Sequence, residues 1–176
     1  MEKIDLDNYL LNQKLTEEAW KSISSGFPLT HQMLKKWCKM LDWVNVSNNT
    51  NILWTIDMLE EFKEFVDWKK LSSLENVRLF QPIIIEKFKD NWDWDKLIDN
   101  YVFTPTENII EKYADRWNWN KLLRKYQIND LYSTAFFQKY QQYIKPKDLD
   151  GSYLYMKLVE ERENEIVNSL LGVEDK

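Results

Sequence analysis

The sequence predicts an all-α fold, a solenoid-like helical repeat array of about six units of roughly 25 residues each, closed by a C-terminal capping helix. Three observations predict it. One side-chain pattern returns six times, at intervals of 23 to 27 residues. A residue type that caps helices stands at a fixed distance before most copies of the pattern. Only three glycines and four prolines occur in the chain, which leaves little room for strands and hairpins.

Each copy is anchored on one position, and apolar residues stand at constant distances from it. The anchors are Trp20, Trp43, Trp68, Trp94, Trp119 and Pro146. The residues nine before them are Leu11, Leu34, Leu59, Ile85, Ile110 and Phe137. The residues three after them are Ile23, Val46, Leu71, Leu97, Leu122 and Leu149. Such self-similarity indicates units that bury their apolar faces against their neighbours.

The thirteenth residue before each anchor predicts where a first helix begins. These residues, called cap positions below, are Asp7, Thr30, Thr55, Gln81, Thr106 and Ser133. Five of the six have side chains that accept a hydrogen bond from a free backbone N–H of the first helical turn. Apolar residues follow at offsets of about 3, 4, 7 and 11, so we expect a first helix of roughly a dozen residues in each repeat.

A second, shorter helix is predicted to begin at each anchor. The residue before the anchor is Asp42, Asp67, Asp93 or Asn118 in the four central copies, which again suits a helix cap. In the first copy, the positions seven and eleven after the cap position are Lys14 and Glu18, where later copies are mostly aromatic. We expect this polar copy to be the terminal unit of the array, which faces water on one side.

The pattern also predicts the domain organisation. The chain, residues 1–176, is expected to form a single domain with repeats at about 6–26, 27–50, 51–76, 77–101, 102–128 and 129–150. The amphipathic stretch 151–172 carries Leu154, Leu158, Ile166 and Leu170 on one stripe. We predict that it caps the last repeat, and the alternative is a helix that docks into another chain.

Composition excludes several classes of protein. No apolar run approaches the ~20 residues of a membrane span, and the first residues do not form a signal peptide. Cys38 is the single cysteine, so a disulfide framework is excluded and a reducing, cytoplasmic location is expected. Abundant lysine and asparagine with scarce alanine suggest an AT-rich coding sequence, hence a low-GC bacterium or its phage.

Residues that carry chemistry are few. His31 is the only histidine, and no nucleophile or orienting carboxylate is identifiable as its partner. Cys38 has lysines nearby but is placed neither at a helix N-terminus nor beside a histidine. The segment Asp90–Asp95 is similar to a calcium loop but lacks the turn glycine and the distal glutamate of an EF-hand. We therefore predict no catalytic, metal-binding or cofactor-binding residue, no cofactor and no enzymatic activity.

The charge pattern points to a protein partner. The net charge is −5, against the basic balance of proteins that follow a phosphate backbone. A lysine stripe runs beside a glutamate stripe, which is typical of a solvated helix face. The candidate partner-binding residues are Lys35, Lys36 and Lys39 at a basic end, with Glu60, Glu61, Glu64, Glu86 and Glu111 in the more acidic copies.

The sequences W-D-W-D-K-L at 92–97 and W-N-W-N-K-L at 117–122 resemble those of short Trp-anchored helical repeat proteins of bacteria and their phages. The likeness covers roughly residues 6–150 and implies a fold but no functional residues.

The function expected is non-catalytic protein–protein interaction, as an inhibitor or adaptor, without a membrane partner. One alternative is a phage- or mobile-element-encoded, anti-CRISPR-like inhibitor, whose acidic surface occupies the basic groove of a nucleic-acid-processing enzyme or ribonucleoprotein. Another is direct nucleic-acid binding, and an enzyme is the class least supported.

Overall fold

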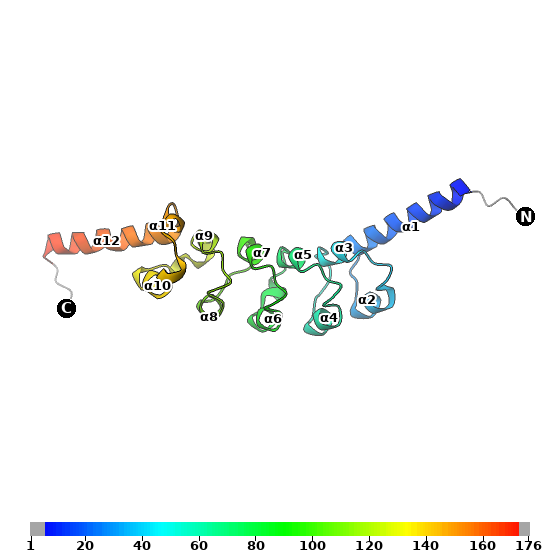
Figure 1. Cartoon of the computed structure of the whole chain (residues 1–176), viewed down its shortest axis with the longest axis horizontal. Helices are drawn as coiled ribbons and strands as arrows, with labels where there is room; N and C mark the ends of the chain where they lie inside the picture. Colours follow the sequence, from blue (N-terminus) through cyan, green and yellow to red (C-terminus); the bar gives the residue numbers. More distant parts are fainter. Residues whose placement is uncertain (1–5, 173–176) are drawn as a thin grey trace, which may run out of the picture. The chain divides into compact units, whose positions relative to one another are not determined.

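The computed structural model describes residues 6–172, and every regular element in that range is a helix (Figure 1). The prediction of an all-α protein is confirmed. Backbone contacts divide the chain into two compact units, Met1–Asp93 and Trp94–Lys176, which are described separately below. The prediction of a single domain stays a prediction.

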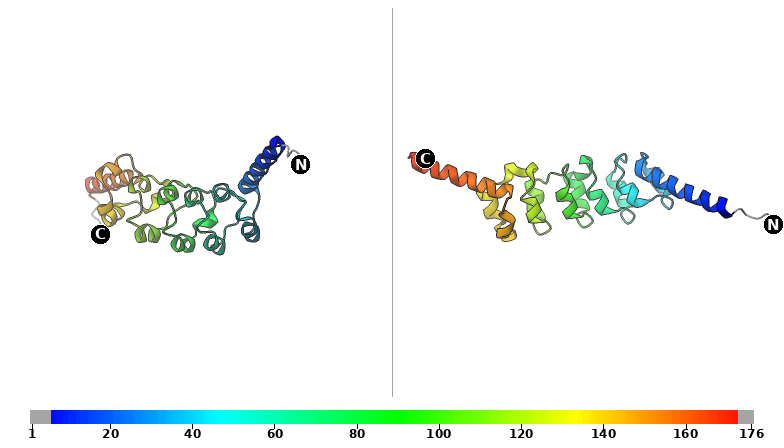
Figure 2. Two further views of the ribbon diagram at one scale, coloured as in Figure 1. Left: turned by 45° about the vertical axis from the view of Figure 1, so that its right-hand side comes forward. Right: turned by 90° about the horizontal axis from the view of Figure 1, so that it is seen from above.

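The N-terminal unit contains six α-helices and one 3₁₀ helix among the described residues. They are α1 (Leu6–Gly26), α2 (His31–Trp37), α3 (Trp43–Ser47), α4 (Ile56–Glu61), α5 (Trp68–Ser72), η1 (Val77–Phe80) and α6 (Pro82–Lys87). Helices α2, α4 and α6 lie side by side in one row, with α3 and α5 in a second row, and α1 runs outward past α2 (Figures 1 and 2).

The C-terminal unit repeats the alternation of two helix types and ends in a long helix. Its described elements are α7 (Trp94–Asp99), α8 (Glu107–Lys112), α9 (Trp119–Leu122), η2 (Tyr126–Leu131), α10 (Thr134–Tyr140), η3 (Gln141–Tyr143), α11 (Pro146–Leu149) and α12 (Tyr153–Leu171). Glycine ends α12, because Gly172 adopts the left-handed conformation (φ 68°) that closes a helix C-terminus.

Predicted helix caps are present at both helix types, but Asp7 is not a cap, because α1 already begins at Leu6. The side chains of Thr30, Thr55, Thr106 and Ser133 each accept a hydrogen bond from the backbone N–H three residues on. The side chains of Asp42, Asp67 and Asn118 cap the helices that begin at the next residue. Gln81 makes no side-chain cap, and Pro82 follows it at the first helical position, where the missing N–H costs nothing.

The first helices are shorter than the dozen residues that the pattern predicts. Helix α4, for example, has six residues, and Phe62 (φ −105°, ψ 16°) forms its C-cap. Turns follow it, so that both Phe62 and Val66 still point into the core. The anchor Trp68 donates its indole N–H to the carbonyl of Lys63 (3.0 Å), which satisfies a carbonyl near the helix end. Equivalent bonds join Trp43 to Cys38 (2.9 Å) and Trp119 to Ala114 (2.8 Å).

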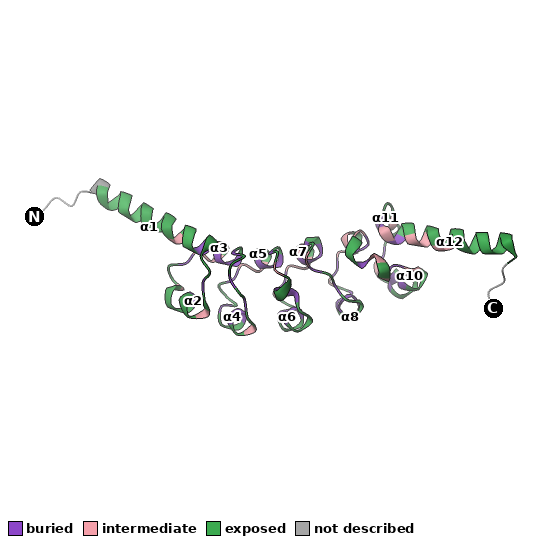
Figure 3. Cartoon of the chain, turned by 180° about the vertical axis from the view of Figure 1, so that it is seen from behind, coloured by how far each residue is buried: buried purple, intermediate pink, exposed green. Residues whose placement is uncertain are grey.

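The first copy differs more strongly, because α1 is one continuous helix of 21 residues where a helix pair was predicted. Its positions Lys14 and Glu18 are polar and exposed, so no buried aromatic side chain draws the chain into a turn. A helix with no tertiary contact to interrupt it continues as its local propensity allows. Figure 3 shows α1 exposed along most of its length.

The core of each unit is built from one recurring ring contact and one aliphatic column. In the N-terminal unit Trp43 packs on Phe62 (ring centroids 5.2 Å apart) and Trp68 packs on Phe88 (5.3 Å). In the C-terminal unit the same pair of positions gives Trp94 on Tyr113 (4.9 Å) and Trp119 on Tyr140 (5.1 Å). The aliphatic residues three after these anchors, Val46, Leu71, Leu97 and Leu122, are fully buried.

The anchors themselves are less buried than expected. Trp119 is buried, whereas Trp43, Trp68 and Trp94 are half-buried. The repeat pattern predicts equivalent buried positions for the four anchors. Their ring contacts are equivalent, but these three are only half-buried. The physical reason is size: an indole covers its partner ring with one part while another part remains at the surface.

Candidate protein-binding surfaces

Among the predicted partner-binding residues, Lys35, Glu60, Glu61 and Glu111 form ion pairs between neighbouring helices. Glu61 of α4 receives hydrogen bonds from Lys35 Nζ (2.7 Å) and from His31 Nε2 (2.6 Å) of α2. Glu60 of α4 pairs with Lys87 of α6 (2.7 Å). In the C-terminal unit, Glu111 of α8 pairs with Lys139 of α10 at 2.9 Å.

These pairs follow one rule of register. The residue six after a cap position pairs with the residues one or five after the cap position of the preceding copy. Glu61 meets His31 and Lys35 in this way, Lys87 meets Glu60, and Lys139 meets Glu107 (3.1 Å) and Glu111. The lysine and glutamate stripes of the sequence therefore interlock between copies. Each exposed pair adds little stability, but it neutralises charge that a partner would otherwise meet.

The remaining candidates are Lys36, Lys39, Glu64 and Glu86. The ammonium of Lys36 lies over the ring of Trp37, 5.0 Å from its centroid. Lys39 lines a groove beside α1, and Glu64 and Glu86 are exposed in the N-terminal unit. The structure brings Lys35 and Glu61 together as a pair, but it does not gather the eight residues into one described surface, since Glu111 belongs to the other unit.

His31 has a partner that the sequence did not reveal. Its hydrogen bond to Glu61 crosses thirty positions of sequence, and its ring also meets Phe62 edge-on at 5.6 Å. The Glu61 carboxyl pKa lies below its ordinary value, mainly because Lys35 and then His31 donate hydrogen bonds to it. This trio lies at the surface and joins α2 to α4 through charged hydrogen bonds. Within residues 6–172 no cluster of three metal-ligating side chains occurs.

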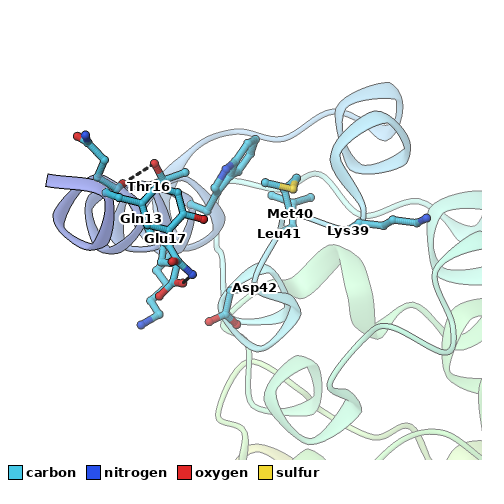
Figure 4. A pocket seen from close by; sticks show the side chains of 11 residues that line it. Gln13, Thr16, Glu17, Lys39, Met40, Leu41 and Asp42 are labelled. Atoms are coloured by element: carbon cyan, nitrogen blue, oxygen red, sulfur yellow. Dashed lines mark hydrogen bonds between the residues drawn. The ribbon is translucent and has the colours of Figure 1, made fainter. Parts of the chain in front are cut away.

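A groove of about 730 Å³ opens beside α1 in the N-terminal unit (Figure 4). One wall is the face of α1 that carries Gln13, Thr16 and Glu17, and the opposite wall is the segment with Met40 and Leu41 that leads into α3. Its other lining residues are Tyr9, Asn12, Trp20, Lys21, Lys39 and Asp42. The repeat pattern does not predict this groove, because it predicts a second helix that begins at Trp20, within α1.

The second apolar surface belongs to α12. Leu154 at its start is fully buried, and Glu161 accepts hydrogen bonds from the backbone N–H (2.8 Å) and hydroxyl (2.6 Å) of Thr134. Beyond Glu161 every described residue is exposed, including a cluster of apolar side chains, Ile166, Val167, Leu170 and Leu171. The predicted capping helix therefore packs on the last repeat with its first half only. Its second half finds no surface in the described residues because the copy beneath it ends at α11.

An apolar groove of about 390 Å³ lies where α12 crosses the last copy. Phe137 of α10 and Leu149 of α11 face Tyr155, Leu158 and Val159 of α12 across it. Ile166 extends the same surface toward the exposed half of the helix, and Arg162 and Glu163 complete its lining. This surface, which we call the α12 surface, joins a groove to a stripe of exposed aliphatic residues.

Buried polar residues that the repeat pattern does not mark connect successive copies. Six residues after the anchors, Asn49 donates to the carbonyls of Ser24 (3.0 Å) and Phe27 (2.8 Å). The equivalent Lys125 donates to the carbonyls of Ile98 (2.9 Å) and Asn100 (2.8 Å). Burial lowers the Lys125 pKa to about 8. Asn49 is fully buried and Lys125 is 5 % exposed, so both act as internal connectors of the fold.

No helix in the described part of the chain combines the length and the apolar character needed to cross a membrane. Comparison of the chain with protein-family models, with curated proteins and with solved structures gives no match in any of the three.

Proposed function

We propose that this protein is a non-catalytic protein-binding module of the helical repeat type, acting as an inhibitor or adaptor in the cytoplasm. The observation that carries the proposal is the α12 surface. Its exposed half presents Ile166, Val167, Leu170 and Leu171, of which Leu170 is 80 % exposed. Contiguous apolar side chains rimmed by charged residues are characteristic of surfaces that another protein covers.

The mode of binding would be a helix laid against an apolar groove. The stripe of α12 repeats at the spacing of one helix face, with Ile166 and Leu170 four residues apart. Arg162 and Glu165 form an ion pair (2.7 Å) beside it, which supplies a polar rim. The partner surface that fits is apolar and elongated.

The interlocked charges argue against the acidic-mimic version of the proposal. Glu60, Glu61 and Glu111 already have cationic partners within the chain. A basic groove that bound them would have to break these pairs, so the gain in electrostatic energy would be reduced. We therefore favour α12 over the glutamate stripe as the surface that contacts the partner.

The test is an affinity capture from bacterial lysate with matched variants. The double variant L170E/L171E is expected to lose a protein that the natural chain retains, because two carboxylates cannot be buried in an apolar groove. The variant L53E is the control, since Leu53 is also exposed but lies in the other unit. Circular dichroism checks that both variants keep their helix content.

In a second version of this experiment, the lysate is treated with nuclease before capture. A protein retained with and without this treatment supports direct protein binding. Recovery of nucleic acid alone, or equal retention of every protein by L170E/L171E, would contradict the proposal.

A further inference from the structure

The face of α2 is uncovered at two positions that are buried in every later copy. Met33, three residues after its cap position, is 38 % exposed, while its equivalent Met58 is 3 % exposed. Trp37, seven after the cap position, is 40 % exposed, while its equivalent Phe62 is 3 % exposed. In the remaining copies the same two positions hold buried residues as well, namely Ile84 and Phe88, Ile109 and Tyr113, and Phe136 and Tyr140.

The later copies show what covers this face. Phe62 of the third copy lies between the anchor Trp43 (5.2 Å) and His31 of α2 (5.6 Å), both from the preceding copy. Helix α2 thus covers α4 beside the anchor. Trp37 has the equivalent anchor contact, with Trp20 at 5.4 Å. It lacks a preceding first helix, because the first copy continues as α1 in place of turning back.

The missing helix exists in the same chain, and it is itself uncovered. Residues 8–15 of α1, which we call the α1 arm, occupy the register of a first helix. Leu11 in the arm is 53 % exposed, although its equivalents Leu34 and Leu59 are completely buried. Leu10 is 53 % and Leu15 is 58 % exposed. Among the α1 residues whose side chains are described, Ser24 alone is buried.

We propose that the α1 arm of one molecule covers the open face of α2 in a second copy of this chain, so that two copies exchange arms. The arm cannot reach its own α2 while α1 stays one continuous helix that runs outward (Figures 1 and 2). Exchange of an identical element between two copies of a chain is a low-cost route to a dimer. The arm and the face belong to one sequence and fit one register, which makes a second copy the occupant.

Charge at the new contact is compatible with the exchange. Lys36 lies six residues after the cap position Thr30. By the rule that the ion pairs follow, it would meet the residues one and five after Asp7, the cap position of the first copy. These are Asn8 and Asn12, whose amide carbonyls accept hydrogen bonds from an ammonium group. Neither residue is a cation, so Lys36 would meet no charge repulsion. The contact would stand where later copies have an ion pair such as Lys35–Glu61. The groove beside α1 adjoins this face, because Trp20 lines it and touches Trp37.

The first experiment measures mass in solution by sedimentation over a range of protein concentration. The natural chain is expected to form a dimer, and L10E/L11E is expected to be monomeric with unchanged helix content. The control L53E alters an exposed leucine outside both the arm and the α12 surface and should stay dimeric. A natural chain that is monomeric at all concentrations, or a dimer that survives L10E/L11E, would overturn the proposal.

The second experiment is complementation. The variant M33E/W37E carries an intact arm but a damaged face, and L10E/L11E carries the reverse. Each alone should be monomeric, and a mixture should recover a dimer through one intact arm and one intact face. A mixture that stays monomeric would exclude arm exchange even if both variants fold.

The third experiment identifies which molecule supplies the arm. In a C38S background, N12C and K36C are introduced into one chain and joined with a bifunctional maleimide. Arm exchange predicts a product of doubled mass. A product of single mass would show the arm folded onto its own α2, and no product would show that the two positions never meet. Either of these results rejects the exchange.

Discussion

The hydroxyl of Ser47 accepts a hydrogen bond from the backbone N–H of Asp67, one copy further along the chain, at 2.9 Å. The same hydroxyl donates to the carbonyl of Trp43 (2.6 Å), four residues before it. Ser24 and Ser72 accept equivalent bonds from Asp42 (2.9 Å) and Asp93 (3.0 Å). In the C-terminal unit the equivalent positions are Ile98 and Leu123, so the serine relay belongs to the N-terminal unit.

These two hydrogen bonds make the Ser47 hydroxyl important for the stability of the fold. Ser47 is fully buried, and S47A would leave the Asp67 N–H without its partner. We expect S47A to lower the free energy of unfolding by about 1–3 kcal/mol, the usual cost of an unsatisfied buried group. Urea denaturation followed by circular dichroism measures it. The control S73A removes an exposed hydroxyl and should leave the free energy of unfolding nearly unchanged. Equal effects of the two variants would contradict a stabilising role of the Ser47–Asp67 hydrogen bond.

The unequal burial of the anchors gives a second prediction. Trp119 is 6 % exposed and stacks on Tyr143 (5.5 Å between centroids), whereas Trp94 in the same unit is half-buried. We expect W119A to cost about 3–5 kcal/mol of unfolding free energy, and W94A to cost less. Thermal and urea unfolding of the two variants compare them directly. A larger loss for W94A would mean that the anchors do not contribute in proportion to their burial.

Much of the fold was predictable because the capping residues and the apolar columns act locally. Thr55, for instance, caps α4 through a contact within one helical turn, and any sequence with this spacing favours the same geometry. The lengths of the first helices were not predictable, since the turn after Phe62 depends on the indole hydrogen bond and on burial of Val66. Tertiary contacts of this kind override helix propensity.

The surfaces were less predictable than the fold. The glutamate stripe is visible in the sequence, but its lysine partners come from helices one copy away. Pairing between copies depends on how the copies stack, which a single-copy pattern does not contain. The open face of α2 was not predictable for a related reason: Met33 and Trp37 match the buried columns, and only the continuity of α1 uncovers them.

The pKa of Glu61 supplies a third prediction. Its carboxyl has a pKa below its ordinary value, so the stabilisation from its pairing is present at neutral pH and is lost as the pH falls through the folded-state pKa. We expect K35M to raise the Glu61 pKa toward the ordinary range, and H31N to raise it by a smaller amount, because Lys35 is the larger cause. Carboxyl chemical shifts recorded by NMR during acid titration measure both. The variant K63M serves as the control and should leave the Glu61 titration unchanged.

The buried amine of Lys125 gives the last prediction, a dependence of stability on alkaline pH. Burial lowers the Lys125 pKa to about 8 in the folded chain, against about 10.4 for an exposed lysine. Between these values the unfolded chain binds more protons than the folded chain, so stability contributed by this group rises with pH. From pH 8 to pH 10 we expect the gain to be about 2 kcal/mol relative to a variant without the amine.

The measurement is the free energy of unfolding of the natural chain and of K125M at pH 7, 8, 9 and 10. The methionine matches the length of the lysine stem but does not titrate, and it leaves the carbonyls of Ile98 and Asn100 without their donor. The free energy of unfolding of the natural chain is therefore expected to rise relative to that of K125M between pH 8 and pH 10. The exposed Lys147 provides the control, because K147M should follow the natural chain at every pH. A constant difference between K125M and the natural chain would mean that Lys125 keeps an ordinary pKa, with its two carbonyl partners offsetting the cost of burial.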